Sequence, residues 1–155
     1  MEAGSVFIWE NYPNANDKII KPRWFVYFGE IRDDPFISGK GEIFTIAFTT
    51  TSKIDFYVKG GERFDKPHIR FKPREGFGFE LECVLDLSFP PDSTSLQILR
   101  ANINERNIKQ KGVISKEKLR QIYYKILESK SLSRKLKQII HNNLNAIGIT
   151  GLPNP

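Results

Sequence analysis

The chain has little cysteine and little histidine. Cys83 is its only cysteine, and His68 and His141 are its only histidines, among 155 residues. A single cysteine excludes an internal disulfide, and these three side chains are too few for a Cys/His zinc site. The sequence therefore predicts no structural metal and no bound cofactor, and Cys83, among apolar neighbours, is expected to be a buried small residue.

Long apolar runs are also absent. No stretch approaches the roughly 20 consecutive apolar residues of a membrane helix, and residues 1–5 (MEAGS) lack the basic start and apolar centre of a secretion signal. We therefore expect a soluble, cytoplasmic protein that does not bind membranes. The length suits one domain with a sizeable core, so a single domain over residues 1–155 is expected.

Positive charge is unevenly distributed along the chain. Residues 1–100 hold 13 Lys and Arg against 15 Asp and Glu, whereas residues 101–155 hold 11 against 3. Such a basic segment attracts nucleic acid or an acidic protein, but it also occurs as a solvated face that keeps a protein soluble. Charge alone does not choose among these interpretations.

Short apolar runs rich in aromatic and β-branched residues fill the first hundred residues, and clusters of Gly, Pro, Asn and Asp separate them. This pattern predicts β-strands joined by turns. We expect strands at residues 6–9, 24–28, 43–48, 54–58, 68–71, 77–87 and 96–99.

The apolar period becomes helical after Ser115. One amphipathic helix is predicted from this N-cap, and a second from Ser131 or Ser133 to Gly148. Strands without intervening helices favour an antiparallel sheet or small barrel with helices at its end. The expected fold class is α+β, mainly β: a β-barrel part over residues 1–112, two C-terminal helices over 113–147 and a tail over 148–155.

Arg23 lies where a polar loop enters an apolar strand. A guanidinium is charged at any working pH and carries a planar fork of donors, so it suits a phosphate or carboxylate better than a core. Arg23 is therefore the first candidate functional residue.

Four short motifs occur in an order that resembles the MazF/PemK/Kid-like toxins. GSVFIWENYP (4–13) is similar to the family's opening strand, and RWFVY (23–27) is similar to its Arg-Pro-apolar strand, with Trp24 in place of the proline. IAFTTTSK (46–53) resembles the strand that ends in Thr-Thr or Thr-Ser, and KGVIS (111–115) resembles the lead into the helix. The resemblance covers the first two-thirds of the chain and the first helix.

This resemblance implies an SH3-like barrel that acts as a homodimer. Such proteins are mRNA interferases, endoribonucleases that cleave single-stranded RNA without a metal, and a cognate antitoxin protein fills the RNA groove. By this resemblance Arg23 holds or protonates the scissile phosphate, and Thr49 and Thr50 donate hydrogen bonds that fix it. Attack by a ribose 2′-hydroxyl needs a base, an acid and cationic donors, and no metal.

The general base is the least defined member of this set. Asp86 approximates the family's later acidic segment, although the glutamine and the basic residue that follow there are missing. Asp17, in the loop before Arg23, is the second candidate. An aspartate at a strand end is also a common turn-former or cap, and a loop aspartate is commonly solvated.

Further RNA contacts are expected from Asp17 and from three other residues. Tyr27 shares a strand face with Arg23, and Lys72 and Arg74 lie in a segment that alternates charges, glycines and aromatics. The alternative function is a catalytically silent relative, a nucleic-acid-binding or protein-binding module that kept the barrel and lost the base. A base within reach of Arg23 distinguishes the two.

Overall fold

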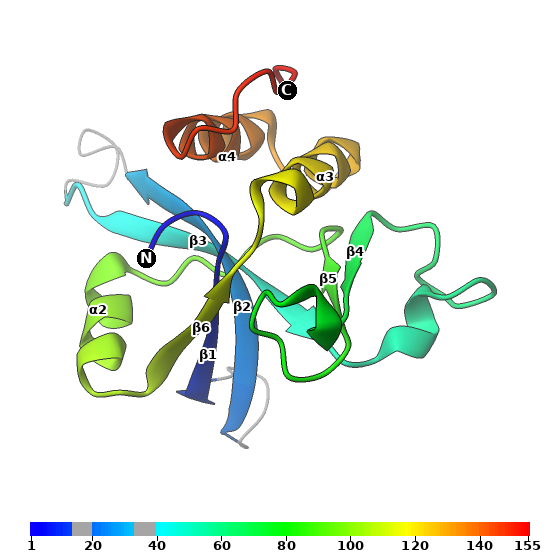
Figure 1. Cartoon of the computed structure of the whole chain (residues 1–155). Helices are drawn as coiled ribbons and strands as arrows, with labels where there is room; N and C mark the ends of the chain where they lie inside the picture. Colours follow the sequence, from blue (N-terminus) through cyan, green and yellow to red (C-terminus); the bar gives the residue numbers. More distant parts are fainter. Residues whose placement is uncertain (14–19, 33–39) are drawn as a thin grey trace.

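The structure is a computed structural model that describes residues 1–13, 20–32 and 40–155. Asp17 lies outside the described residues. Figure 1 shows the strands β1 (Ser5–Tyr12), β2 (Lys21–Arg32), β3 (Ile43–Thr51), β4 (His68–Phe71), β5 (Cys83–Asp86) and β6 (Ile108–Val113), the 3-10 helices η1 (Ile54–Tyr57) and η2 (Pro73–Glu75), and the α-helices α2 (Leu96–Asn104), α3 (Lys116–Glu128) and α4 (Arg134–Ala146).

The strands form one curled six-stranded sheet in the order β4-β5-β3-β2-β1-β6 (Figure 1). Each neighbouring pair is antiparallel. The central strands are connected in sequence order, so β1, β2 and β3 follow one another as a meander. The prediction of a mainly β, α+β fold with C-terminal helices is confirmed.

The segment between β4 and β5 approaches the far edge of the sheet. Gly78, at φ +98°, lies so close to β6 that a Cβ there would meet the Lys111 backbone at 2.6 Å. A Cβ on Gly112 would meet the Phe77 carbonyl oxygen at 2.3 Å. Two glycines facing each other therefore permit a backbone contact that joins the two edges of the curled sheet.

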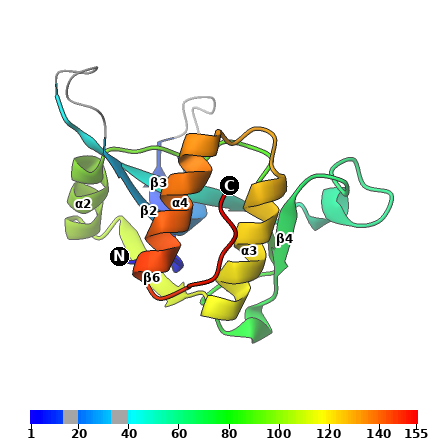
Figure 2. The ribbon, with the colours of Figure 1, turned by 90° about the horizontal axis from the view of Figure 1, so that it is seen from above.

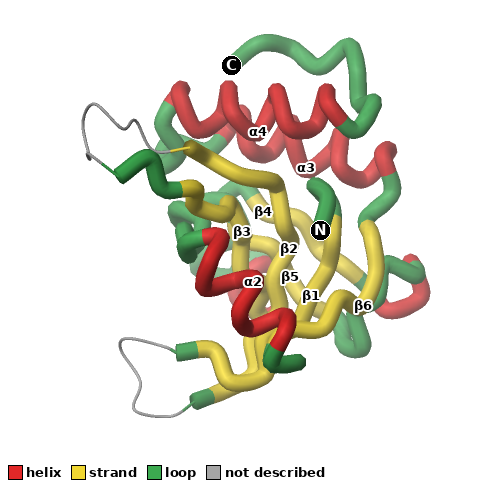
Figure 3. Tube along the Cα trace, turned by 90° about the vertical axis from the view of Figure 1, so that its left-hand side faces the viewer, coloured by secondary structure: helices red, strands yellow, loops and turns green. Residues whose placement is uncertain are grey.

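The two faces of the sheet belong to different apolar cores. Val26 and Phe28 of β2 point into the larger core, which α3 and α4 cover (Figure 2). The alternate residues, Phe25 and Tyr27, point into a smaller core beneath α2. Figure 3 shows α2 lying across the face formed by the central strands. The period of two along β2 thus sets which helix each side chain meets.

A bulge in β2 fixes the position of α4. Gly29 adopts φ +109°, and the β2–β3 register shifts between Tyr27 and Gly29. At this point Asn143 Nδ2 donates a hydrogen bond of 2.9 Å to the Phe28 carbonyl oxygen. The glycine leaves room for the amide, because a Cβ there would meet Asn143 Nδ2 at 2.3 Å.

Both C-terminal helices begin as predicted. The Ser115 hydroxyl accepts a hydrogen bond from Lys118 N at the start of α3, and Ser133, rather than Ser131, caps α4. Beyond α4, Gly148 adopts φ +84°, in the left-handed region favoured after a helix.

Three strand predictions are wrong in whole or in part. Residues 96–99 begin α2, because Ser95 caps the helix and Leu96 and Leu99 lie on one helical face. In the predicted strand 54–58, Ile54–Tyr57 form the 3-10 helix η1, and only residues 83–86 of the predicted strand 77–87 join the sheet. Strand β6 was not predicted, because its sequence, IKQKGV, is mostly polar and does not alternate regularly between apolar and polar residues.

In the described ranges, no helix combines the length and apolar character needed to cross a membrane.

Candidate functional site

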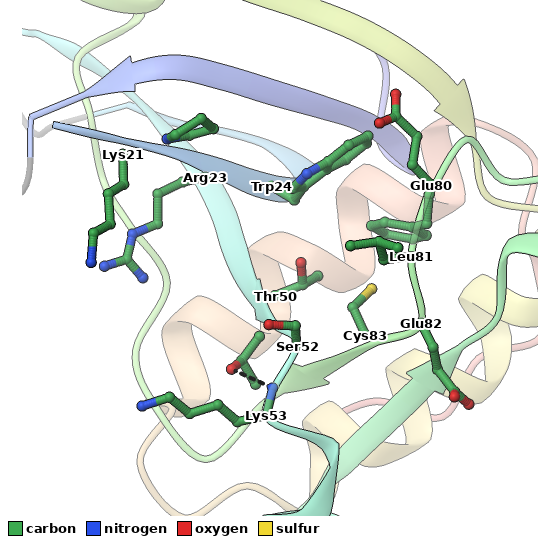
Figure 4. Close-up of a pocket in the computed structure, with 13 residues that line it drawn as sticks. Lys21, Arg23, Trp24, Thr50, Ser52, Lys53, Glu80, Leu81, Glu82 and Cys83 are labelled. Carbon is green, nitrogen blue, oxygen red and sulfur yellow. Dashed lines mark hydrogen bonds between the residues drawn. The ribbon is translucent and has the colours of Figure 1, made fainter.

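The candidate site lies where β2 and β3 separate. Their ladder reaches its last pair at Phe25 and Thr49, after which Thr50 and Thr51 pair with β5. The end of β2 that holds Arg23 stays paired with β1. A pocket of about 570 Å³ opens between the diverging strands, and we call it the strand-gap pocket (Figure 4). Its lining residues are Lys21, Pro22, Arg23, Trp24, Thr50, Thr51, Ser52, Lys53, Phe79, Glu80, Leu81, Glu82 and Cys83.

Three cations gather at one side of the strand-gap pocket. Lys21 and Arg23 extend from β2, and Lys53 extends from the residues just after β3 (Figure 4). Among the described residues, none of the three has a carboxylate within ion-pair distance. Their charge is therefore available for an anion that enters the pocket.

The carboxylates at the other side of the pocket are neutralised. Glu80 accepts from Lys111 Nζ at 2.7 Å, and Glu82 accepts from Arg70 Nε at 2.6 Å. The hydrogen bond from Arg70 lowers the pKa of Glu82. The local excess of charge is thus positive.

Hydroxyl groups lie beside the cations. Thr50, Thr51 and Ser52 line the strand-gap pocket, and the Thr51 hydroxyl accepts from Lys53 N at 3.2 Å, which fixes the turn that presents Lys53 (Figure 4). Cys83 also lines the pocket, and burial raises the pKa of its thiol to about 11. Short donors next to cations suit an oxyanion such as phosphate.

A second pocket continues the first. It has a volume of about 280 Å³ and shares Arg23, Thr50, Thr51 and Lys53 with the strand-gap pocket. We call it the aromatic pocket, and we call the two together the groove. Its other lining residues are Phe48, Thr49, Phe56, Tyr57, Arg63, Asp86, Phe89 and Pro90.

The groove brings together four residues that the sequence analysis selected. Arg23, Thr49, Thr50 and Asp86 come from β2, β3 and β5, yet all line the aromatic pocket. Thr49 is exposed, whereas Arg23 and Thr50 are half-buried. These residues converge because β3 pairs with β2 up to Thr49 and with β5 from Thr50 onward.

Asp86 is the centre of a closed hydrogen-bond network. Its Oδ2 accepts from Tyr57 OH at 2.6 Å and from Arg63 Nε at 2.7 Å. Its Oδ1 accepts from Ser88 N at 2.8 Å and from Ser88 Oγ at 2.5 Å. Arg63 Nη2 also donates to Ser88 Oγ at 2.6 Å. The carboxylate therefore joins η1 and its following turn to the end of β5.

This network decides what Asp86 can do. Burial by itself raises the pKa of the carboxyl, but the hydrogen bonds from Ser88, Tyr57 and Arg63 outweigh it and lower the pKa. A carboxylate that already accepts four hydrogen bonds and binds protons weakly is poorly suited to remove a proton from a substrate. The geometry assigns Asp86 to holding the groove wall in place.

Tyr27 lies outside the groove. It is only 3 % exposed in the smaller core, and its hydroxyl lies 3.4 Å from Glu30 Oε1. The strand period correctly placed it on the Arg23 face, but α2 covers that face away from the strand end. Its ring is not available for stacking on a base in this structure.

Lys72 and Arg74 lie at a neighbouring shallow pocket with Arg70 and Glu82. The segment that carries them is tied down, because Glu75 accepts from Lys72 N at 2.8 Å and from Lys118 Nζ at 2.9 Å. These hydrogen bonds help to lower the pKa of Glu75, against the effect of burial, which raises it. The two cations adjoin the groove through Glu82, which lines both pockets.

Several groove residues had no local signal in the sequence. Lys53 is an exception, because it directly follows the Thr-Thr-Thr-Ser motif. Nothing in the local sequence indicated Arg63 or Phe89. Arg63 reaches the groove through its contact with Asp86, 23 residues away, and Phe89 reaches it through the path of the chain after β5. Among the described residues, no group of three or more His, Cys, Asp or Glu side chains is arranged to hold a metal ion.

The sequence matches no protein-family model. A search of curated proteins also returns no match.

Proposed function

We propose that this protein is an endoribonuclease that cleaves single-stranded RNA without a metal. The observation that carries the proposal is the convergence of Arg23, Thr49 and Thr50 with Lys21 and Lys53 in one groove. Three cations without ion-pair partners in the described part of the chain, next to hydroxyl donors, suit a phosphodiester.

The chemistry follows from the groups present. The ribose 2′-oxygen attacks the adjacent phosphorus, the bond from phosphorus to the 5′-oxygen breaks, and a 2′,3′-cyclic phosphate and a 5′-hydroxyl form. The 2′-hydroxyl proton passes to a base, and the departing 5′-oxygen takes up a proton. Arg23 and Lys53 stabilise the charge that develops on the phosphoryl oxygens, and Thr49 and Thr50 orient them.

Hydroxide from solvent is the base in this proposal. Asp86 is occupied by its four hydrogen bonds, and Glu80 and Glu82 are paired with basic side chains. Arginine stays protonated, so Arg23 acts as an electrostatic catalyst, and a solvent water gives the departing 5′-oxygen its proton and regenerates hydroxide. The enzyme then gains its rate from positioning and from charge stabilisation.

The resemblance to the MazF/PemK/Kid-like toxins extends the proposal. An SH3-like barrel acting as a homodimer, with a cognate antitoxin protein over the groove, is the corresponding assembly. The curled antiparallel sheet with Arg23 and Thr49 at one strand junction supports it.

A silent RNA-binding module is the second candidate. The observation that favours it is the engagement of Asp86, which leaves the described groove residues without a free carboxylate. Such a module would bind the same RNA through the same cations and leave it intact.

The test is to incubate the full chain with a long single-stranded RNA in EDTA and to map new 5′ ends. We expect cuts at recurring positions and 2′,3′-cyclic phosphate termini. Arg23→Ala should abolish the cuts, whereas Arg100→Ala, which removes an exposed arginine of α2, should retain them. RNA that binds without any cut would establish the binding module instead.

A further inference from the structure

Two exposed phenylalanines form part of the groove wall. Phe56, on η1, is 39 % exposed, and Phe89, just after β5, is 55 % exposed, yet both line the aromatic pocket. Large apolar side chains that stay exposed beside cations signal a binding surface when they lie in a pocket. Lys53 and Arg23 line the same pocket.

The Asp86 network holds the Phe89 ring and the backbone that carries Phe56. The Arg63 guanidinium lies 4.4 Å from the centre of the Phe89 ring, while its Nε donates to Asp86. Arg63 N donates to the Phe56 carbonyl oxygen at 2.8 Å, so the same residue fixes the backbone that carries the other ring. A ring fixed before binding loses little freedom when a ligand stacks on it.

We propose that Phe89 and Phe56 form a subsite in which an unpaired RNA base stacks, next to the phosphate bound by Arg23 and Lys53. This inference rests on the proposed function and identifies residues that select the substrate. A flat aromatic ligand attached to a phosphate matches a pocket where aromatic rings meet Arg23 and Lys53, which form no ion pair with any residue that the structure describes. An aliphatic side chain of a protein would leave the cations unmatched.

The subsite also explains why the substrate must be single-stranded. Both faces of a base inside a duplex are already stacked on its neighbours, so such a base cannot enter the aromatic pocket without being pulled out. A base in a single strand is free to do so. The pocket therefore excludes paired RNA by the cost of unstacking.

The experiment measures binding of a single-stranded 2′-deoxy oligonucleotide that contains 2-aminopurine. This probe keeps the bases and phosphates but lacks the attacking hydroxyl, so it is not cleaved. Linear polyphosphate, which has charge and no bases, serves as the second probe. The variants are Phe89→Leu and Phe56→Leu, with Phe64→Leu as the control, because Phe64 is 46 % exposed but does not line the groove.

We expect the wild-type protein to quench 2-aminopurine fluorescence and Phe89→Leu to weaken oligonucleotide binding between about 5- and 150-fold. Binding of polyphosphate should change less than twofold, and Phe64→Leu should change neither. Normal oligonucleotide binding by both groove variants, with Arg23-dependent cleavage intact, would overturn the stacking subsite alone. A wild-type protein that neither binds this oligonucleotide nor cleaves single-stranded RNA would overturn the proposed function as well.

Discussion

Arg63 and Asp86 form an ion pair of 2.7 Å between the turn after η1 and the end of β5. The Asp86 side chain is 7 % exposed and that of Arg63 is 27 % exposed, so the pair is mostly shielded from solvent. Because Arg63 also covers Phe89, this one contact connects the stability of the fold with the shape of the groove.

Asp86→Asn should destabilise the protein by about 3 kcal/mol at pH 7, because Arg63 and three other donor groups, on Tyr57 and Ser88, lose a charged acceptor. The folded-state pKa of Asp86 is lowered, so its contribution is fully present above the unfolded pKa of about 3.9. It is lost as the pH falls through the lower folded-state pKa. Urea unfolding of both proteins from pH 7 to pH 2 measures this, and equal stabilities at pH 7 would contradict it.

Salt dependence should report the three groove cations. If Lys21, Arg23 and Lys53 each contact one phosphate, the slope of log affinity against log salt for single-stranded RNA is about −2. Lys53→Gln should make this slope less steep by about 0.7. Lys130→Gln, an exposed lysine between α3 and α4, is the control and should leave the slope unchanged. Filter binding from 50 to 300 mM salt gives the slopes.

The pH profile of cleavage tests the absence of a protein base. With hydroxide as the base, the logarithm of the rate should rise with pH between 5 and 8 without a plateau. The described groove residues include no histidine, the side chain that titrates in this range. A plateau above pH 5 or 6 that Asp17→Asn removes would show that Asp17 is the base.

Cys83 should resist thiol reagents in the folded protein. Burial raises its pKa to about 11, so at pH 8 only about 0.1 % is thiolate, the reactive form. Labelling with a disulfide reagent should therefore be at least a hundredfold slower than in 6 M urea. Equal rates in both conditions would mean that the strand-gap pocket exposes the sulfur.

Gly29→Ala should destabilise the fold more than Gly60→Ala. Both glycines have a left-handed φ, so each substitution carries a backbone cost of about 1–2 kcal/mol. A Cβ at Gly60 has nothing within 4 Å, whereas one at Gly29 would collide with Asn143 and disturb its hydrogen bond to Phe28. We expect an additional loss of about 1–3 kcal/mol for Gly29→Ala. Denaturant unfolding of both variants measures the difference.

Local patterns predicted much of the architecture. Ser115 followed by an apolar face at helical spacing was sufficient for α3, because capping and periodicity are properties of neighbouring residues. The same kind of local evidence gave a wrong prediction at residues 96–99, which were expected to form a strand. Two leucines in a short apolar run fit a strand and a helix equally well. Packing on the smaller core selected the helix.

The sequence itself placed Arg23 near the start of a strand, and Thr49 and Thr50 near the end of another. Apolar runs define where strands begin and end. The meeting of these three residues was decided by the tertiary structure, in which β3 leaves β2 for β5 and opens the groove. The engagement of Asp86 and the burial of Tyr27 also depended on partners far along the chain. Sequence specifies residue types and local periods, whereas contacts across 23 residues or more arise only when the whole chain packs.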